Sequence, residues 1–322
     1  MKSPAKKTAA KPRVTSKPQA KPLRVIAVLG TSFSGSTVLN LILGAHSKIY
    51  AGGEMIGLLD QRNMPGGGSC TSCGLDCKHW DKSARNRIQK DNFYPFTRSI
   101  FGKDIIVDTS KSMDWFTDIL ARGQNTDVKP AYVLMVKHPI RYLASCMINI
   151  DGAKPVNRVS RLISQFSPAH ARKALLVEWI GVLDRYYDGL LRNLPRDAGE
   201  ADFHIMHYER LVEDQRGTVE PILNSLGLNY EPKLDNFYSA EFHQIGGNNG
   251  AVFQTKKNWN GGDKGVPEFR RKFYEQGPAL KIDNKYASTF TPEEISFLKS
   301  NATVRGMLER LGYNSPKMPF PV

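Results

Sequence analysis

The stretch Gly30-Thr31-Ser32-Phe33-Ser34-Gly35-Ser36-Thr37 follows one apolar run, residues 23–29, and precedes another, residues 38–43. A strand, a tight glycine loop and a helix start in this order predict a phosphate site made of backbone N–H groups. The spacing nearly matches the ATP-binding loop G-x-x-x-x-G-K-[ST], but Ser36 stands where that loop carries its lysine. Because that lysine reaches the β- and γ-phosphates of a triphosphate, its absence argues against ATP hydrolysis and favours another phosphate-like ligand.

Strand-like and helical patterns alternate along the rest of the chain. The strand-like runs are 23–29, 105–107, 132–136 and 203–206, and the helical patterns are 37–45, 113–121, 141–148, 173–191 and 219–226. This alternation predicts βαβ units and a mainly parallel central sheet. Ligands of such sheets bind beyond the carboxyl ends of the strands, which here are Gly30, Asp108, Lys137 and His207.

Length and composition fit one sizeable α/β domain or two small ones, since the chain has 322 residues of which 40% are hydrophobic. The apolar runs are too short for a membrane span of about 20 residues. The first ten residues lack the apolar core of a secretory signal. We therefore expect a cytoplasmic protein with no membrane span.

The net charge of +14 is concentrated at the N-terminus, because residues 1–24 contain eight Lys and Arg residues and no acid. A Lys/Pro/Ala segment cannot bury enough apolar surface to order itself, so we expect residues 1–22 to form a disordered basic tail. Binding of nucleic acid or a membrane by this tail is the alternative, but it lacks interleaved aromatic residues. The remaining +6 still suits an anionic ligand.

Polar residues just past the predicted strand ends are the candidates for binding. Lys111 would face the glycine loop and can reach an oxygen of the ligand, although it can equally be a surface lysine. Lys137 and Ser145 are eight residues apart, about two helical turns when the loop is discounted, and can hold a second phosphate with Arg141 as a supplement. Tyr208 can line a nucleotide pocket or simply be a half-buried aromatic at a strand end.

Three of the four cysteines cluster, at Cys70, Cys73 and Cys77, and His79 follows directly. This spacing can hold zinc. A local disulfide, or packing of reduced thiols beside Trp80, is an open alternative. Four cysteines are too few for a disulfide scaffold in a chain of this length.

Together these segments resemble the sulfotransferase family that uses 3′-phosphoadenosine 5′-phosphosulfate (PAPS), its bacterial members above all. Residues 34–37 match the family's 5′-phosphosulfate loop, and 137–145 its 3′-phosphate motif, which is usually R-x-P followed by serine. Residues 208–211 look like its Y-E-x-L strand end, 73–80 its cysteine loop and 243–248 its H-x-x-G-G-N segment. The resemblance spans residues 23–260. It implies a three-layer α/β/α fold of the P-loop NTPase-like kind, with 23–322 as the sulfotransferase domain.

The resemblance also implies a reaction and the residues that carry it. PAPS would be the co-substrate, and its sulfuryl group would pass by in-line displacement to a hydroxyl or amine of a small-molecule, carbohydrate or lipid acceptor, with no metal required. Lys111 would stabilise the sulfuryl group and the leaving oxygen. The nucleotide would lie against Ser34, Gly35, Ser36, Thr37, Lys137, Arg141, Ser145 and Tyr208.

The expected base is Glu54, because residues 45–54 resemble the A-H-x-x-x-x-x-G-E-E run of tyrosine-sulfating relatives. An ordinary loop glutamate is the competing interpretation, and His46 is a weaker alternative base. Two positions depart from the family pattern. Phe33 replaces a basic residue that commonly touches the sulfuryl group, and Lys137 replaces an arginine, giving a point charge instead of a bidentate fork.

Three other functions stay open at this stage. A P-loop-type small-molecule kinase would need an acid for Mg²⁺ beside the loop, and Asp108 is the only contender. A nucleic-acid-binding protein would use the basic tail. A non-catalytic nucleotide-binding relative is suggested by Phe33. Residues 149–172 and the Gly/Asn-rich loop 244–265, with Lys256, Lys257 and Trp259, are expected to shape the acceptor pocket.

Overall fold

The computed structural model describes residues 22–60, 68–150, 168–193, 203–248, 251, 280–282, 284 and 286–314. Residues 1–21 of the expected tail lie outside this range. So do residues 151–167 of the expected acceptor segment, and Lys256, Lys257 and Trp259 of the Gly/Asn-rich loop.

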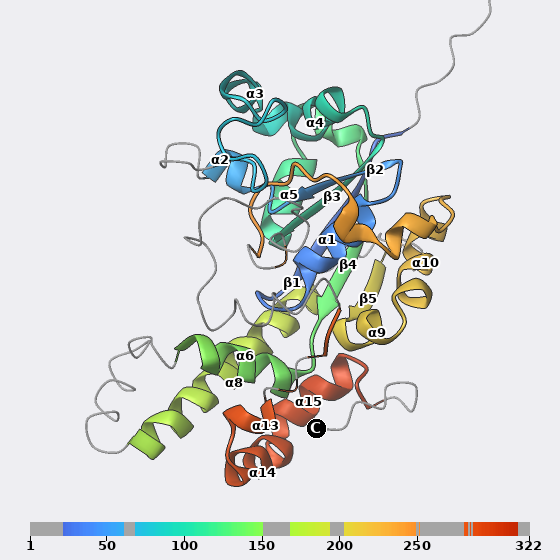
Figure 1. The fold of residues 1–322 in the computed structure, drawn as a ribbon. Coiled ribbons are helices and arrows are strands. Elements are labelled where there is room, and N and C mark those ends of the chain that lie inside the picture. Colours follow the sequence, from blue (N-terminus) through green and yellow to red (C-terminus); the bar gives the residue numbers. More distant parts are fainter. Residues whose placement is uncertain are drawn as a thin grey trace, which may run out of the picture.

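Five parallel strands form the central sheet in the order β2-β3-β1-β4-β5 (Figure 1). Their bounds are β1 Arg24–Gly30, β2 Ile49–Gly53, β3 Ile105–Lys111, β4 Lys129–Val136 and β5 Phe203–His207. The first strand lies at the centre and pairs with β3 on one side and β4 on the other. The chain therefore crosses over in both directions from β1, and the crevice at its carboxyl end is where such sheets bind ligands.

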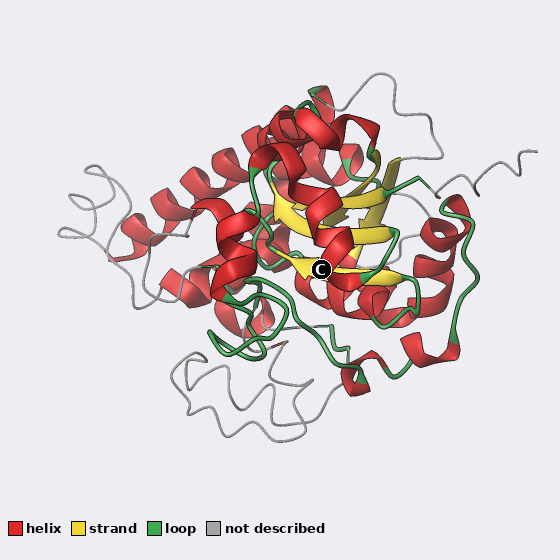
Figure 2. Cartoon of the chain, turned by 90° about the horizontal axis from the view of Figure 1, so that it is seen from above, coloured by secondary structure: helices red, strands yellow, loops and turns green. Residues whose placement is uncertain are grey.

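Helices cover both faces of the sheet (Figure 2). They are α1 (Ser36–Gly44), α2 (Gly57–Asp60), α3 (Lys82–Arg87), α4 (Phe93–Phe101), α5 (Met113–Leu120), α6 (Pro139–Ile150), α8 (Pro168–Arg192), α9 (Tyr208–Glu213), α10 (Gln215–Ser225), α13 (Tyr286–Thr289), α14 (Pro292–Ser300) and α15 (Ala302–Arg310). The C-terminal helices α13 and α15 pack beside α6 and α8.

The alternation of side chains along β1 separates two hydrophobic cores. Val25, Ala27 and Leu29 pack with residues of α4, α5, α6, α8 and α15. Ile26 and Val28 point to the opposite face and pack with residues of α1 and α10. Since successive side chains of a strand alternate between faces, the sheet is enclosed between two helical layers. The predicted three-layer α/β/α fold with a parallel sheet is confirmed.

The sequence patterns locate four of the five strands and miss β2. Its sequence Ile-Tyr-Ala-Gly-Gly is short and ends in two glycines, which weaken the pattern of a strand. All five of its residues are buried because it pairs with β3 in register from Ile49 opposite Ile105. Pairing with β3 thus makes this segment a strand, although its local strand propensity is weak.

Side-chain caps set the starts of several helices, among them α14 and α10. The Thr291 hydroxyl accepts the Glu294 N–H, and the Glu294 carboxylate accepts the Thr291 N–H, which is a capping box at α14. At α10 the Asp214 carboxylate accepts the Gly217 N–H, so this helix begins at Gln215, four residues before the predicted start at 219. None of the helices in the described part of the chain is both long and apolar enough to cross a membrane.

Candidate active site

Two glycines shape the loop between β1 and α1. The backbone φ angle is 140° at Gly30 and 95° at Gly35, in the region that residues with a Cβ atom avoid. A Cβ at Gly30 would lie 2.5 Å from the Met135 carbonyl oxygen, and one at Gly35 would lie 2.4 Å from the Tyr208 ring. The loop can therefore press against β4 and Tyr208 only because both positions are glycine.

The N-terminus of α1 presents backbone N–H groups at the end of this loop. Gly35 is the N-cap residue, and no side chain within the described residues caps the helix there. The Ser34 hydroxyl donates to the Thr31 carbonyl oxygen at 2.8 Å, which closes the turn. The Thr37 hydroxyl accepts the Asn248 N–H at 3.0 Å, which leaves its own proton able to reach a ligand. This arrangement suits an anion.

Glu54 and Lys111 meet beside the loop. The Lys111 ammonium forms an ion pair with the Glu54 carboxylate. Both side chains line a cavity of about 380 Å³, together with Gly30, Thr31 and Ser32 of the loop. The remaining wall is formed by Ser110, Ser112, Tyr142, Val182, Leu183 and Tyr186. The two residues expected to carry the chemistry thus share one cavity with Gly30, Thr31 and Ser32, which directly precede the expected phosphosulfate residues 34–37 in the glycine loop.

Tyr186 of α8 joins the glycine loop to the end of β3. Its hydroxyl oxygen lies 2.6 Å from the Gly30 carbonyl oxygen and 3.2 Å from that of Lys111. The hydroxyl also accepts the Gly30 N–H at 3.2 Å. Burial raises the pKa of Tyr186 to about 12, so the hydroxyl keeps its proton near neutral pH and can act as a donor. Lys111 has a left-handed φ of 63° at this point, which the contact with Tyr186 helps to hold.

A second cluster of polar groups lies where β4 leads into α6. The Lys137 ammonium donates to the Ser145 hydroxyl at 2.9 Å, and it lies 5.7 Å from the centre of the Tyr208 ring. Arg141 donates to Asn284 Oδ1 at 2.6 Å and stacks over the Tyr286 ring. Both cations are 6% exposed. The spacing expected between Lys137 and Ser145 is therefore realised as a direct contact.

Glu209 holds the end of β4 to the C-terminal helices. Its buried carboxylate accepts the His138 N–H at 3.0 Å and the Tyr313 hydroxyl at 2.8 Å. His138 itself is 5% exposed and packs edge-on against Tyr313. Burial, reinforced by the charge of Arg141, lowers the pKa of His138 to about 3. These contacts indicate that His138 and Glu209 have a structural role next to the cluster.

His46 and Asp108, two residues considered for chemistry, are both buried and hydrogen-bonded within the protein. His46 is 3% exposed, and its Nε2 hydrogen-bonds to the Asn229 carbonyl oxygen at 3.1 Å while Nδ1 accepts the Lys48 N–H. Asp108 is fully buried, and burial raises the pKa of its carboxyl group. Its oxygens accept hydrogen bonds from Tyr94, Trp115 and Ser110. The Asp108 carboxylate thus stabilises the core, and its oxygens are not available to a nucleotide-bound metal ion.

Two solved structures resemble this chain along almost their whole length. They are a sulfotransferase domain from the Synechococcus PCC 7002 olefin synthase and a sulfotransferase domain from the curacin biosynthetic pathway. The first has a TM-score of 0.58 and 18% sequence identity, over 93% of this chain and 98% of that one. The second has a TM-score of 0.55 and 17% identity, over 92% of this chain and 100% of that one. The chain has the sulfotransferase fold. No protein-family model matches the sequence, and no curated protein matches it.

In this sulfotransferase fold the sequence analysis missed the residues that connect the site. Gln244 accepts a hydrogen bond from the Asn40 side chain at 2.7 Å, and Asn40 in turn accepts the Gly53 N–H at 3.1 Å. The Glu54 N–H donates to the Ile245 carbonyl oxygen at 2.6 Å. The segment around Gln244 therefore holds Glu54 in place, although it is far away in sequence. The H-x-x-G-G-N pattern at 243–248 is the signal that could have indicated it.

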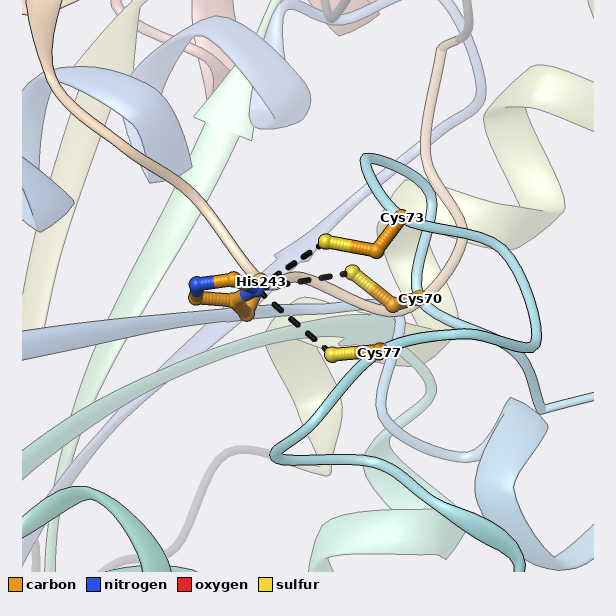
Figure 3. Close-up of side chains that lie close together, drawn as sticks. All are labelled: Cys70, Cys73, Cys77 and His243. Carbon is orange, nitrogen blue, oxygen red and sulfur yellow. Dashed lines mark hydrogen bonds between the residues drawn. The ribbon is translucent and has the colours of Figure 1, made fainter.

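The three clustered cysteines contact this segment through His243, a partner that was not expected from the sequence. Cys70, Cys73 and Cys77 surround the ring of His243 (Figure 3). His79, the expected fourth member, instead packs against the His243 ring at a tilt of 59°, with the ring centres 4.5 Å apart. All four cysteines of the chain are free thiols in the structure, so the local disulfide considered for this cluster is not formed.

Proposed function

We propose that the protein is a sulfotransferase that moves the sulfuryl group of PAPS to a hydroxyl or amine acceptor by in-line displacement. The observation that carries this proposal is the ion pair between Glu54 and Lys111 in the cavity that the glycine loop borders. This transfer needs a base, a cation and an anion-binding helix end, and the glycine loop that borders the cavity leads directly into the N-terminus of α1.

The donor would lie across the two clusters of the site. Its 5′-phosphosulfate would accept hydrogen bonds from the backbone N–H groups of residues 34–37 and from the Ser36 and Thr37 hydroxyls. Its 3′-phosphate would accept from Lys137 and Ser145, with Arg141 beside them. Tyr208 supports this placement, because its ring contacts the Gly35 position on one side and Lys137 on the other. The two expected phosphate sites therefore lie next to each other, with the Tyr208 side chain in contact with both.

The chemical step follows from the position of the two charged groups. The acceptor oxygen forms a bond to sulfur while its proton passes to the Glu54 carboxylate. The bond between sulfur and the phosphate oxygen breaks, and its electron pair leaves with 3′,5′-bisphosphoadenosine. The Lys111 ammonium stabilises the negative charge that develops on the departing oxygen. Its ion pair with Glu54 shows that both groups reach one point in the cavity.

The cavity wall favours an acceptor with an apolar body. Leu183 and Tyr142 are buried in the wall, and Val182 exposes 41% of its surface. A phenol or a lipid alcohol can lay its apolar part against these side chains while its hydroxyl faces Glu54.

Two other functions are distinguished by specific residues. A kinase is disfavoured, because Asp108 is fully buried and its oxygens already accept hydrogen bonds from the core. A nucleotide-binding relative without activity is the second candidate. It is favoured by Phe33, which is 38% exposed in the loop where related enzymes have a cation.

The direct test is transfer of a labelled sulfuryl group from PAPS to a panel of phenols, lipid alcohols, sugars and amines. We expect labelled product with at least one acceptor, and loss of most of it with Lys111→Ala. Lys299→Ala, an exposed lysine at the end of α14, is the matched control and should leave turnover unchanged. Binding of 3′,5′-bisphosphoadenosine without transfer to any acceptor would favour the inactive relative.

A further inference from the structure

Three thiols converge on one ring nitrogen beside the site. The sulfur atoms of Cys70, Cys73 and Cys77 lie 3.9, 3.4 and 3.5 Å from Nδ1 of His243. The four potential ligand atoms all lie within 4.8 Å of one another, and their side chains point toward a common centre (Figure 3).

Hydrogen bonding alone does not account for this convergence. An imidazole nitrogen has a single in-plane direction in which it donates or accepts one hydrogen bond, so it cannot serve three thiols. A tetrahedral zinc ion does account for it. Zinc–sulfur bonds of about 2.3 Å and a zinc–nitrogen bond of about 2.0 Å at tetrahedral angles place sulfur and nitrogen about 3.5 Å apart. The three measured distances lie around that value.

The surrounding chain is arranged as at a metal site. Cys70 and Cys73 flank a tight turn in which the Gly74 N–H donates to the Cys70 carbonyl oxygen at 2.8 Å, and Gly74 has a φ of 67°. On the far side of the imidazole, Nε2 of His243 lies 3.0 Å from a Glu241 carboxylate oxygen. A carboxylate on the second nitrogen is the usual way in which a metal-binding histidine is oriented.

We propose that Cys70, Cys73, Cys77 and His243 bind one Zn²⁺ ion as a structural site. The set of three thiolates and one imidazole fills a tetrahedral shell, so it offers no open position for a substrate or a water molecule. Cys70 and Cys77 are 1% exposed, and the Trp80 backbone N–H donates to the Cys77 sulfur at 3.4 Å. The ion therefore joins residues 70–77 to the segment around His243.

This crosslink would act on the active site through the backbone. Two residues after His243, Ile245 forms bridges with both Gly53 and Cys70. Its carbonyl oxygen accepts the Glu54 N–H, and three residues later the Asn248 N–H donates to Thr37. The zinc ion thus anchors a segment that holds both Glu54 and the N-terminus of α1.

The test uses the full chain and needs no activity measurement. We expect one zinc ion per chain by elemental analysis after purification without added metal. We also expect Co²⁺ to replace it in the chelator-treated protein, with the absorption bands of a tetrahedral thiolate complex. His243→Ala and Cys73→Ser should bind Co²⁺ at least tenfold more weakly. His79→Ala and Cys146→Ser are the matched controls and should bind it as the parent does.

Three results would overturn the proposal. The first is a parent protein that contains no zinc and gives no thiolate–cobalt absorption. The second is loss of the metal in His79→Ala with retention in His243→Ala. The third is a count of two free thiols instead of four in the denatured, chelator-treated protein, which would indicate a disulfide. The Co²⁺ titration of the parent does not depend on the folding of any variant.

Discussion

The Lys111 ammonium and the Glu54 carboxylate form an ion pair across 57 residues of sequence. The topology explains their meeting, because Glu54 directly follows β2, Lys111 ends β3, and these strands are parallel neighbours. Their carboxyl ends therefore lie at the same edge of the sheet, next to the loop that follows β1.

Replacing Glu54 by glutamine should remove the base while keeping the shape of the side chain. We expect turnover with PAPS to fall by about 10²- to 10⁴-fold, the usual contribution of a positioned general base. The affinity for 3′,5′-bisphosphoadenosine should change little, since the proposed nucleotide contacts lie elsewhere. Steady-state kinetics and calorimetry measure the two effects. Glu213→Gln on α9, where the carboxylate pairs with Arg210 at the surface, is the control. Unchanged turnover in Glu54→Gln would rule out its role as the base.

Lys137→Ala and Ser145→Ala should each weaken binding of 3′,5′-bisphosphoadenosine. A hydrogen bond to a charged group contributes about 1.5–3 kcal/mol, so we expect affinity to fall about tenfold or more for the lysine and less for the serine. Lys129→Ala, at the opposite end of β4 and exposed, should bind like the parent. Equal affinities for all of these proteins would mean that the 3′-phosphate binds at another place.

Gly35→Ala should damage the loop more than an ordinary glycine replacement does. The new methyl group would lie 2.4 Å from the Tyr208 ring, so either the ring or the loop must move. We expect at least a tenfold loss of nucleotide affinity in calorimetry. Gly102→Ala is the matched control, because its φ is also positive, at 63°, but its Cβ would meet no atom within 4 Å. That variant should lose stability only, by about 1–2 kcal/mol. Similar nucleotide affinities for the two variants would contradict this account of the loop.

His138 should make the protein sensitive to acid. Its pKa in the folded state is about 3, below the ordinary value of 6.5, so the unfolded chain binds a proton that the folded chain does not. Stability from this group is complete above pH 6.5 and is lost as the pH falls toward 3, by up to a factor of ten in the unfolding equilibrium per pH unit. Denaturant unfolding of the parent and of His138→Asn between pH 7 and 4.5 checks this. The difference in unfolding free energy between the two proteins should shrink as the pH falls. A difference that stays constant would contradict the lowered pKa of His138.

Much of the fold could be predicted from local patterns. The glycine loop, four strands and the helices at 36–44, 113–120 and 139–150 all carry strong signals of periodicity or of turn residues. The likeness to sulfotransferases noted from short motifs is confirmed at the level of fold. Lys111 could be placed near the glycine loop in advance because it follows a predicted strand end, whereas Glu54 was expected only from the resemblance, since β2 was not predicted.

The remaining features depend on long-range contacts that no local pattern records. Nearness in sequence favoured His79 as the partner of the cysteines, whereas the chain returns to place His243 there. Tyr186 has the pattern of an ordinary aromatic residue on α8, and its hydroxyl contacts to Gly30 and Lys111 arise only from helix packing. Likewise, Asn40 and Gln244 are buried polar residues that hydrogen-bond to each other although they are far apart in sequence.

In the proposed function the first glycine loop binds a sulfated adenosine nucleotide and not a nucleoside triphosphate. Calorimetric titration of the purified protein with 3′,5′-bisphosphoadenosine and, separately, with ATP tests this choice of ligand. We expect saturable binding of one bisphosphate per chain and at least tenfold weaker binding of ATP. Tight binding of ATP together with no heat from the bisphosphate would contradict it.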